Sequence, residues 1–244
     1  MLNIAVLCGG YGTRLREVLG SIPKVLAPVG GQPFLGLLLK HLIHELGPVG
    51  KFLLLTGYQA EKVEQTIGYI FGSSLISYCI EAEPEGTWNA FVNASQHFRE
   101  SPFLLVNGDT YPINMSLSMQ IFEDSIKDRN CILFGVRRDT DGGRYTSLVS
   151  DDDDYLIEMR KVDPSSHDDG VGSLEIVSSG WFFWPGGQLE KSPDNAEFND
   201  VLLQNIRCGL LKVRVVVVEA GKFIDIGVPT DYRLMSTYLG DQLS

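Results

Sequence analysis

The sequence predicts an α/β fold: a Rossmann-like mixed sheet, mostly parallel and sandwiched by helices, in a single domain. Apolar runs of strand length alternate with amphipathic stretches of helical length up to Asn107. This alternation is typical of parallel strands joined by right-handed helical crossovers. A glycine-rich turn follows the first apolar run, and ligands of such sheets bind beyond the carboxyl ends of the strands.

The elements expected in the first half alternate regularly. Apolar runs predict strands at residues 3–8, 51–56, 75–80 and 103–107. The amphipathic stretches between them predict helices at residues 34–46, 60–71 and 87–98.

From residue 131 the pattern changes to strands separated by tight turns. We expect strands at 131–138, 146–149, 155–160, 175–184 and 212–218, two helices near 185–207, a short stretch at 223–226 and a helix from Pro229. No linker separates the two halves, so one continuous domain is predicted. Asp151–Asp154 lies between two strands and is expected to form a solvated hairpin turn, because consecutive side chains point in opposing directions and cannot share a metal.

Composition excludes several classes of partner. The 44% hydrophobic content is ample for a buried core. The net charge of −11 argues against nucleic acid or an anionic membrane, since both require a Lys/Arg surface. Four widely spaced cysteines predict neither zinc nor disulfides and fit a reducing cytoplasm. We expect no secretory signal, because the first apolar run is only a strand long and lacks a basic leader, and no later run is long enough to cross a bilayer.

The glycine-rich turn has the composition of a triphosphate-binding loop. Gly9, Gly10 and Gly12 follow the first strand, and Arg14 and Lys24 come soon after. Glycines let backbone N–H groups approach phosphate oxygens closely, while the two cations neutralise the remaining charge. The alternative is a strand that simply ends in a glycine turn, and the added cations at this spacing argue against it.

Two common phosphate-binding motifs fit poorly. A P-loop requires a lysine directly after its last glycine, where this chain has Thr13. A dinucleotide-binding turn requires a third small residue where Leu15 stands, and an acid at the end of the next strand, which residues 51–57 do not supply.

Two aspartates are candidate ligands for Mg²⁺. Asp109 follows the strand 103–107, and Asp225 stands between two isoleucines near the end of the chain. A hard cation takes one or two carboxylates together with phosphate oxygens and water. Taken alone, Asp109 is equally a turn former and Asp225 equally a loop-end acid.

Several motifs together resemble one enzyme family. Gly9-Gly10-x-Gly12-Thr13-Arg14, Pro23-Lys24, Glu83-x-x-Gly86-Thr87, Asn107-Gly108-Asp109 and Asp225-Ile226-Gly227 occur in the order found in sugar-1-phosphate nucleotidylyltransferases. The Asn107–Thr110 turn and the stretch Phe223–Tyr232 look most like D-glycero-D-manno-heptose 1-phosphate guanylyltransferases. The resemblance spans essentially the whole chain. It implies the nucleotide-diphospho-sugar transferase fold, with a nucleotide-binding lobe of about 1–130 and a sugar-binding lobe of about 131–244.

The resemblance also implies a reaction and its residues. The phosphate of a sugar 1-phosphate attacks the α-phosphorus of a nucleoside triphosphate and releases pyrophosphate. Arg14 and Lys24 would hold the triphosphate, Asp109 and Asp225 would share Mg²⁺, and Lys161 would hold the sugar phosphate. The implied nucleotide-binding residues are Leu7, Gly9, Gly10, Gly12, Thr13, Arg14, Lys24, Glu83, Gly86, Thr87 and Gly108, and the implied sugar-phosphate-binding residues are Tyr145, Arg160, Lys161, Ser179 and Gly180. A homodimer is the assembly that the family suggests.

The chain departs from the family where the sugar is recognised. Thr146 replaces a glycine, Arg160 replaces an acid, and Ser178-Ser179 replace Asn-Gly. A guanidinium prefers the opposite hydrogen-bond partner to a carboxylate, so Arg160 motivates the hypothesis of an acidic or unusual sugar. Trp88 stands where relatives have a small residue, and packing is favoured there over stacking on the base.

The sequence therefore favours a guanylyltransferase that uses GTP and a heptose 1-phosphate. The same chemistry with mannose 1-phosphate or another hexose 1-phosphate, and with GTP, UTP, CTP or dTTP, stays open. A regulatory subunit that binds a nucleotide sugar without turnover is the alternative from another class. The complete set of cations and metal-binding acids argues against it, because a pure binder has no use for transition-state contacts.

Overall fold

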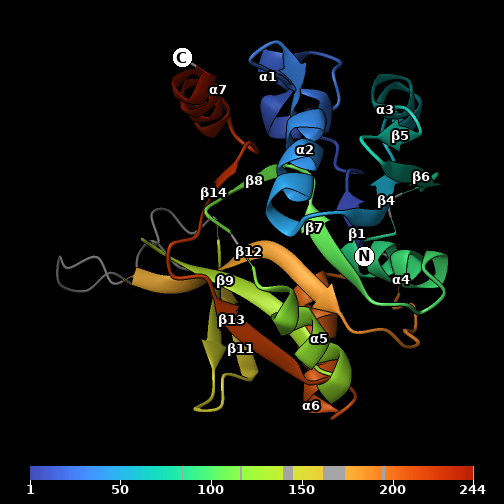
Figure 1. The fold of residues 1–244 in the computed structure, drawn as a ribbon, viewed down its shortest axis with the longest axis vertical. Helices are drawn as coiled ribbons and strands as arrows, with labels where there is room; N and C mark the ends of the chain where they lie inside the picture. The colour runs from blue at the N-terminus through green and yellow to red at the C-terminus, as the bar shows by residue number, and fades with distance from the viewer. Residues whose placement is uncertain (84, 116, 140–144, 162–173, 194–195, 244) are drawn as a thin grey trace.

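The computed structural model describes residues 1–83, 85–115, 117–139, 145–161, 174–193 and 196–243, and its centre is one mixed sheet of ten strands (Figure 1). Four strands pair in parallel in the order β7-β1-β4-β6. Their bounds are Leu2–Leu7 for β1, Val49–Thr56 for β4, Ser74–Ile80 for β6 and Phe103–Asn107 for β7. The predicted parallel sheet is confirmed, and these four strands end at the same edge of the sheet.

The second half of the chain extends the same sheet with mainly antiparallel strands. The long strand β12 (Leu174–Trp184) pairs with β7 and connects the two halves. The strands beyond it are β9 (Cys131–Asp139), β10 (Thr146–Ser150), β11 (Leu156–Lys161) and β13 (Val213–Val217), while β5 (Ile70–Phe71) closes the opposite edge. The two lobes therefore share one continuous sheet.

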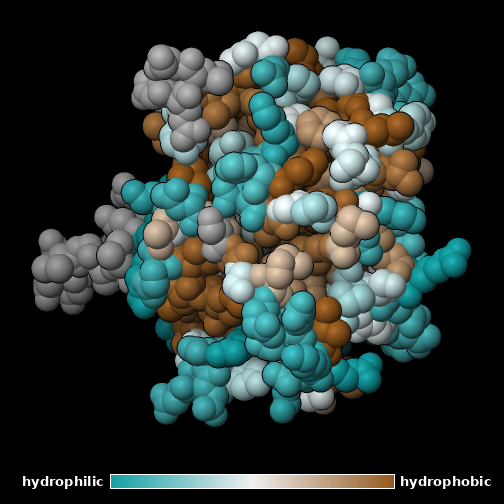
Figure 2. Space-filling view, viewed as in Figure 1, coloured by the Kyte–Doolittle hydropathy of each residue, from teal (hydrophilic) through white to brown (hydrophobic). Residues whose placement is uncertain are grey.

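Helices cover both faces of the sheet because successive strand residues alternate in direction. Val6 packs in the layer that holds α2 (Phe34–Leu46), α3 (Ala60–Ile67), α5 (Met119–Asp128) and α7 (Pro229–Leu243). Its neighbour Ala5 packs in the opposite layer, against α4 (Thr87–His97) and α6 (Phe198–Arg207). Burial on both faces explains why the parallel strands are almost continuously apolar. Hydrophobic residues also reach the surface near the centre of the visible face, surrounded by polar ones (Figure 2).

Short elements complete the fold near the edge where the parallel strands end. They are the 3₁₀ helices Thr13–Leu15 and Lys24–Leu26, the helix α1 (Arg16–Leu19), and the two-stranded sheets β2 (Pro28–Val29) with β3 (Gln32–Pro33) and β8 (Thr110–Ile113) with β14 (Lys222–Asp225). None of the described helices combines the length and the hydropathy that crossing a bilayer requires.

Three sequence predictions about elements need correction. The helix expected at 60–71 ends at Ile67, because Gly68 takes a positive φ of 76°, and β5 follows. One helix, α6, stands where two were expected near 185–207: Gly186 and Gly187 have φ of 104° and 113°, which a helix excludes. The helix α5 was not predicted, although Ser118 caps it by accepting a hydrogen bond from the Gln120 N–H (3.2 Å).

The prediction for Asp151–Asp154 is confirmed. Oδ1 of Asp151 accepts hydrogen bonds from the backbone N–H groups of Asp153 (3.1 Å) and Tyr155 (2.8 Å), which is an Asx-type turn between β10 and β11. All four cysteines carry free thiols, as their spacing indicated.

Gly108 is required by the packing of the central strands. A Cβ atom on this residue would lie 2.4 Å from the Leu7 carbonyl oxygen, which accepts the Gly108 N–H at 3.0 Å. We expect Gly108→Ala to lower the free energy of unfolding by about 1–3 kcal/mol, because backbone must move to admit the methyl group. Urea denaturation measures it. Gly10→Ala is the matched control, since no atom lies within 4 Å of its added Cβ; equal loss in both variants would contradict the argument.

Candidate active site

A cavity of about 340 Å³ lies at the carboxyl ends of the four parallel strands. Each of these strands contributes to its wall near its last residue, as expected for a doubly wound sheet. The lining residues are Leu7, Cys8, Gly9, Gly10, Tyr11, Lys24, Val25, Leu55, Glu81, Gly86, Thr87, Ala90, Asn107 and Asp109. We call it the glycine-loop cavity.

The glycine-rich turn packs directly on the segment that carries Lys24. Gly12 has the left-handed φ of 58°, and a Cβ there would lie 3.0 Å from Cβ of Lys24. Thr13 and Arg14 follow in a short 3₁₀ helix with exposed side chains, and the buried Leu15 anchors that helix in the core. The two predicted cations are therefore carried by segments in direct contact.

The start of α4 forms another part of the wall. Gly86 precedes the helix with φ of 89° and ψ of 159°, a conformation essentially restricted to glycine. Thr87, the first helical residue, lines the cavity beside it. A helix N-terminus presents unpaired N–H groups and partial positive charge, which suits an anionic ligand.

Lys24 and Asp109 form an ion pair in this wall. Nζ of Lys24 contacts Oδ2 of Asp109, and their side chains are only 17% and 24% exposed. The Thr110 hydroxyl donates to the other carboxylate oxygen of Asp109 at 3.2 Å. A phosphate oxygen could replace Asp109 as the partner of Lys24, and a cation could replace Lys24 as the partner of Asp109. The pair thus holds both charges ready for a metal-bound phosphate.

The structure brings Asp225 to the same place from the far end of the chain. In the antiparallel pairing of β8 with β14, Asp225 lies opposite Thr110. The Ile226 N–H donates to the Asp109 carbonyl oxygen at 2.9 Å. Oδ1 of Asp225 accepts the Gly227 N–H at 2.7 Å, which sets the direction of the carboxylate. Asp225 is therefore paired with the residue that follows Asp109, so the two aspartates stand at neighbouring backbone positions.

These residues fit a hard divalent cation. Asp109 and Asp225 offer oxygen ligands from neighbouring strands, and within the described ranges no group of three or more His, Cys, Asp or Glu side chains forms a complete protein site. A cation held here would take its other ligands from phosphate oxygens and water, as Mg²⁺ does in phosphoryl-transfer sites.

A second cavity of about 310 Å³ adjoins the first and shares Leu7, Thr87 and Asn107 with it. Its polar lining consists of hydroxyls, amides and two carboxylates. The remaining lining residues are Leu105, Thr110, Leu133, Tyr145, Thr146, Met159, Ser178, Ser179, Gly180, Phe182, Glu197, Phe198, Asn199, Phe223 and Asp225. Gly180, with φ of 77°, lets β12 approach β7 here, since a Cβ would lie 2.5 Å from the Asn107 amide nitrogen.

Seven predicted residues are absent from both cavity walls: Gly12, Thr13, Arg14, Glu83, Gly108, Arg160 and Lys161. Glu83 is exposed. Arg160 is 62% exposed and pairs with Glu158 at 2.5 Å, on the face of β11 opposite to Met159. Lys161 lies opposite Thr146 and on the same strand face as Met159, which lines the second cavity, so its exposed side chain extends from that cavity's border. The geometry therefore gives no support to an acidic sugar selected by Arg160.

Sequence reasoning missed two acids that do line the cavities. Glu81 directly follows β6, and its buried Oε1 has no hydrogen-bond partner among the described residues. Burial raises the pKa of this carboxyl, and the charge of Glu85 raises it further. Glu81 could have been found from its position at the end of the third parallel strand. Glu197 lines the second cavity just before α6, and only the fold shows it.

Trp88 packs in the core, as the sequence favoured. Its side chain is buried, its ring lies 5.4 Å from Phe91 and 5.7 Å from Phe198 between centroids, and its Nε1 donates to the Glu190 carbonyl oxygen at 2.9 Å. Trp88 is absent from the walls of both cavities.

The raised pKa of Glu81 predicts a pH dependence of stability. A folded-state pKa above the ordinary value near 4.5 means that the folded protein binds the proton more tightly than the unfolded chain. The contribution of Glu81 to the free energy of unfolding therefore falls as pH rises from about 4 towards neutrality. Glu81→Gln removes this titration, so its stability relative to wild type should increase over that range in urea denaturation. A difference between the two proteins that stays constant over this range would refute the assignment.

Comparison with known proteins agrees with this geometry. The chain is 28% identical to D-glycero-alpha-D-manno-heptose 1-phosphate guanylyltransferases of Aneurinibacillus thermoaerophilus, over 95% of this chain and 96% of the relative, and of Campylobacter jejuni, over 95% and 97%. HddC from Yersinia pseudotuberculosis superimposes with a TM-score of 0.76 at 29% identity, covering 98% of this chain and all of that one, and its structure complexed with GMP-PN gives 0.75. The family model for nucleotidyl transferases matches residues 4–240. The chain therefore belongs to the nucleotidyl transferase family.

Proposed function

We propose that this protein transfers GMP from GTP to a sugar 1-phosphate, most specifically D-glycero-D-manno-heptose 1-phosphate, and releases pyrophosphate. The observation that carries the proposal is the pair of adjoining cavities, one lined by Lys24 and Asp109 and the other by Asp225, with Asp225 paired to the residue after Asp109 through β8 and β14. One cavity has a phosphate-binding loop, and the other has a polar, hydroxyl-rich lining. The names of the relatives and the GMP-PN complex of HddC support GTP and a heptose as the substrates.

The arrangement suits an in-line displacement at the α-phosphorus. A phosphate oxygen of the sugar 1-phosphate forms the new P–O bond while the bond to the bridging oxygen breaks, and pyrophosphate leaves with that electron pair. Catalysis then depends on alignment and charge neutralisation more than on covalent chemistry. The glycine loop and Arg14 would hold the β and γ phosphates, Lys24 the α-phosphate and Lys161 the sugar phosphate.

Asp109 and Asp225 would hold Mg²⁺ at the α-phosphate. When bound, this ion supplies charge neutralisation and orientation of the phosphate oxygens. The Gly227 N–H keeps the Asp225 carboxylate in place before the substrate arrives. Lys24, released from Asp109, is then free to contact the transferring phosphate.

Glu81 is suited to recognise guanine. A carboxylate offers two acceptor oxygens, and guanine presents two adjacent donors, N1–H and the exocyclic amino group, whereas no other common base has two neighbouring donors on that edge. The unpartnered buried oxygen of Glu81 lies in the wall of the glycine-loop cavity. Binding guanine would stabilise the charged carboxylate that burial otherwise disfavours.

The second cavity suits a neutral, polyhydroxylated sugar. Its described lining includes no lysine or arginine, while Glu197 and Asn199 stand with the hydroxyls of Thr146 and Ser178 around the space. A carboxylate accepts hydrogen bonds from sugar hydroxyls, and amides both donate and accept. Glu197 thus provides the acid that the sequence lacks at Arg160.

Pyrophosphate release over a grid of nucleoside triphosphates and sugar 1-phosphates tests this function. We expect GTP with the heptose 1-phosphate to give the highest kcat/KM. Glu81→Gln should lower kcat/KM for GTP about 5- to 150-fold, the effect of losing a bidentate base contact, and should affect UTP much less.

Two outcomes of the grid would overturn parts of the proposal. Preference for another triphosphate or hexose 1-phosphate would change the substrates and keep the mechanism. Binding of nucleotide or nucleotide sugar without any turnover would favour the regulatory subunit. The exposed Glu83→Gln is the matched control for Glu81→Gln.

Removal of one metal-binding carboxylate tests the other part of the mechanism. We expect Asp225→Asn to lower kcat about a hundredfold or more, since charge stabilisation at the α-phosphate is lost. Wild-type activity should vanish with a chelator and return with Mg²⁺. Asp153→Asn, in the exposed turn before β11, should leave kcat unchanged. Full activity without a divalent ion would refute the metal assignment.

A further inference from the structure

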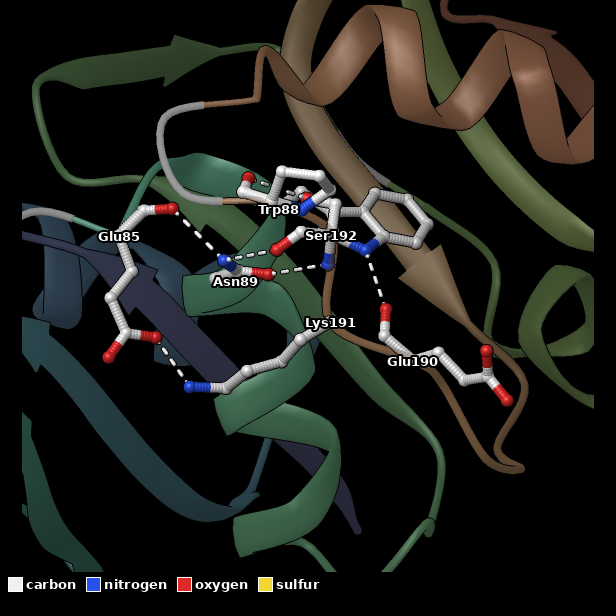
Figure 3. Close-up of polar contacts among 7 residues, drawn as sticks. Glu85, Trp88, Asn89, Glu190, Lys191 and Ser192 are labelled. Atoms are coloured by element: carbon white, nitrogen blue, oxygen red, sulfur yellow. Dashed lines mark hydrogen bonds and ion pairs between the residues drawn. The ribbon is translucent and has the colours of Figure 1, made fainter.

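A segment without regular structure passes beside the start of α4, and two consecutive helix residues hold it by hydrogen bonds (Figure 3). Nδ2 of Asn89 donates to the Ser192 carbonyl oxygen at 3.1 Å, and Oδ1 of Asn89 accepts the Ser192 N–H at 3.0 Å. Nε1 of Trp88 donates to the Glu190 carbonyl oxygen at 2.9 Å. We refer to residues 190–192 as the crossing segment.

Asn89 is the central residue of these contacts. Its side chain is fully buried, and it makes both hydrogen bonds to the backbone of Ser192 together with a third to the Glu85 carbonyl oxygen at 3.1 Å. If the Asn89 amide is removed, the backbone groups that it contacts are left without hydrogen bonds, at a cost of about 1–3 kcal/mol for each buried group. The Asn89 side chain therefore replaces the pairing that a strand neighbour would otherwise give the crossing segment.

In the sequence, the crossing segment is followed within a few residues by part of the wall of the second cavity. These residues are Glu197, Phe198 and Asn199, all of which line that cavity. Trp88 packs against Phe198 with ring centroids 5.7 Å apart. On the other side, Trp88 and Asn89 follow Thr87, which lines both cavities. The two residues thus connect the nucleotide side of the site to the sugar side.

The two sides depend on these contacts to different degrees. Residues 87–89 belong to α4, whose backbone is held by its own helical hydrogen bonds and by the buried Ala90 and Phe91. The crossing segment has no helix or strand of its own. Lys191 also pairs with Glu85, but both side chains are substantially exposed (45% and 37%), and such pairs contribute little. Loss of the Trp88 and Asn89 contacts should therefore displace the crossing segment more than α4, and with it Glu197, which precedes the first residue of α6.

We propose that Trp88 and Asn89 are positioning residues that set the Glu197–Asn199 wall for the sugar 1-phosphate. They line neither cavity and act through the crossing segment and through the contact of Trp88 with Phe198. This inference rests on the proposed function, in which the second cavity holds the sugar. It gives this chain a specificity element outside both pockets, at the two residues that follow the nucleotide-binding Gly86-Thr87 pair.

Asn89→Ala tests the proposal in the full-length protein with GTP, Mg²⁺ and the sugar 1-phosphate that wild type uses best. We expect KM for the sugar 1-phosphate to rise about tenfold, because small displacements of a positioning wall weaken alignment strongly, while KM for GTP changes less than about twofold. Hydrogen exchange at residues 188–199 of the free protein should accelerate as well. Trp88→Phe keeps an aromatic ring but removes the N–H donor together with the pyrrole part of the indole, and it should shift the same KM in the same direction.

The matched control is Asn205→Ala. Nδ2 of Asn205 donates to the Val201 carbonyl oxygen at 2.8 Å within α6, so this change removes a side-chain hydrogen bond without releasing the crossing segment. Faster exchange in Asn89→Ala with both KM values unchanged would show a structural role only and overturn the proposal. An equal rise in both KM values would overturn it too. Absence of pyrophosphate release by wild type with every sugar 1-phosphate would instead refute the proposed function, and this inference with it.

Discussion

The site depends on the pairing of two very short strands. β8 follows Asp109 directly, and β14 ends at Asp225, so their antiparallel register brings the two aspartates to neighbouring backbone positions. The hydrogen bond from the Ile226 N–H to the Asp109 carbonyl fixes the relation between the two backbones. This pairing therefore holds Asp225, in the wall of the second cavity, beside Asp109, in the wall of the glycine-loop cavity.

Local charge balance explains how an acidic protein can hold a polyphosphate. The chain carries a net charge of −11, yet Lys24 stands in the cavity wall and the segment with Arg14 packs close by. Lys24 and Asp109 neutralise each other's charge in the wall, and each partner can exchange the other for a ligand of the right sign. Helix α4 adds its N-terminus to the same wall. A few positive groups in the cavity wall thus matter more for an anionic ligand than the net charge of the chain, because the effect of distant charges is screened.

Two glycines that the motifs assign to substrate binding are needed because strands approach each other closely there. Gly108 is needed against the Leu7 carbonyl, and Gly180 is needed against Asn107. Both sit where β1, β7 and β12 converge between the two cavities. Their first role is therefore to let these backbones approach closely beside the two cavities. Trp88 and Asn89 act in a comparable way on the crossing segment, which has no strand partner and is held by their hydrogen bonds.

The sequence by itself determined the fold class, and it predicted the phosphate loop and both aspartates, because these depend on local signals: apolar periodicity, glycine spacing and acids at strand ends. It also favoured the packing role of Trp88, since a large apolar ring at the start of an amphipathic helix prefers burial. Only the tertiary structure decided which side chains face the cavities. Arg160 and Glu83 were expected to bind substrate yet lie outside both walls, while Glu81 and Glu197 line them. The physical reason is that direction depends on strand alternation and long-range register, and a shift of one residue reverses the face that a side chain occupies.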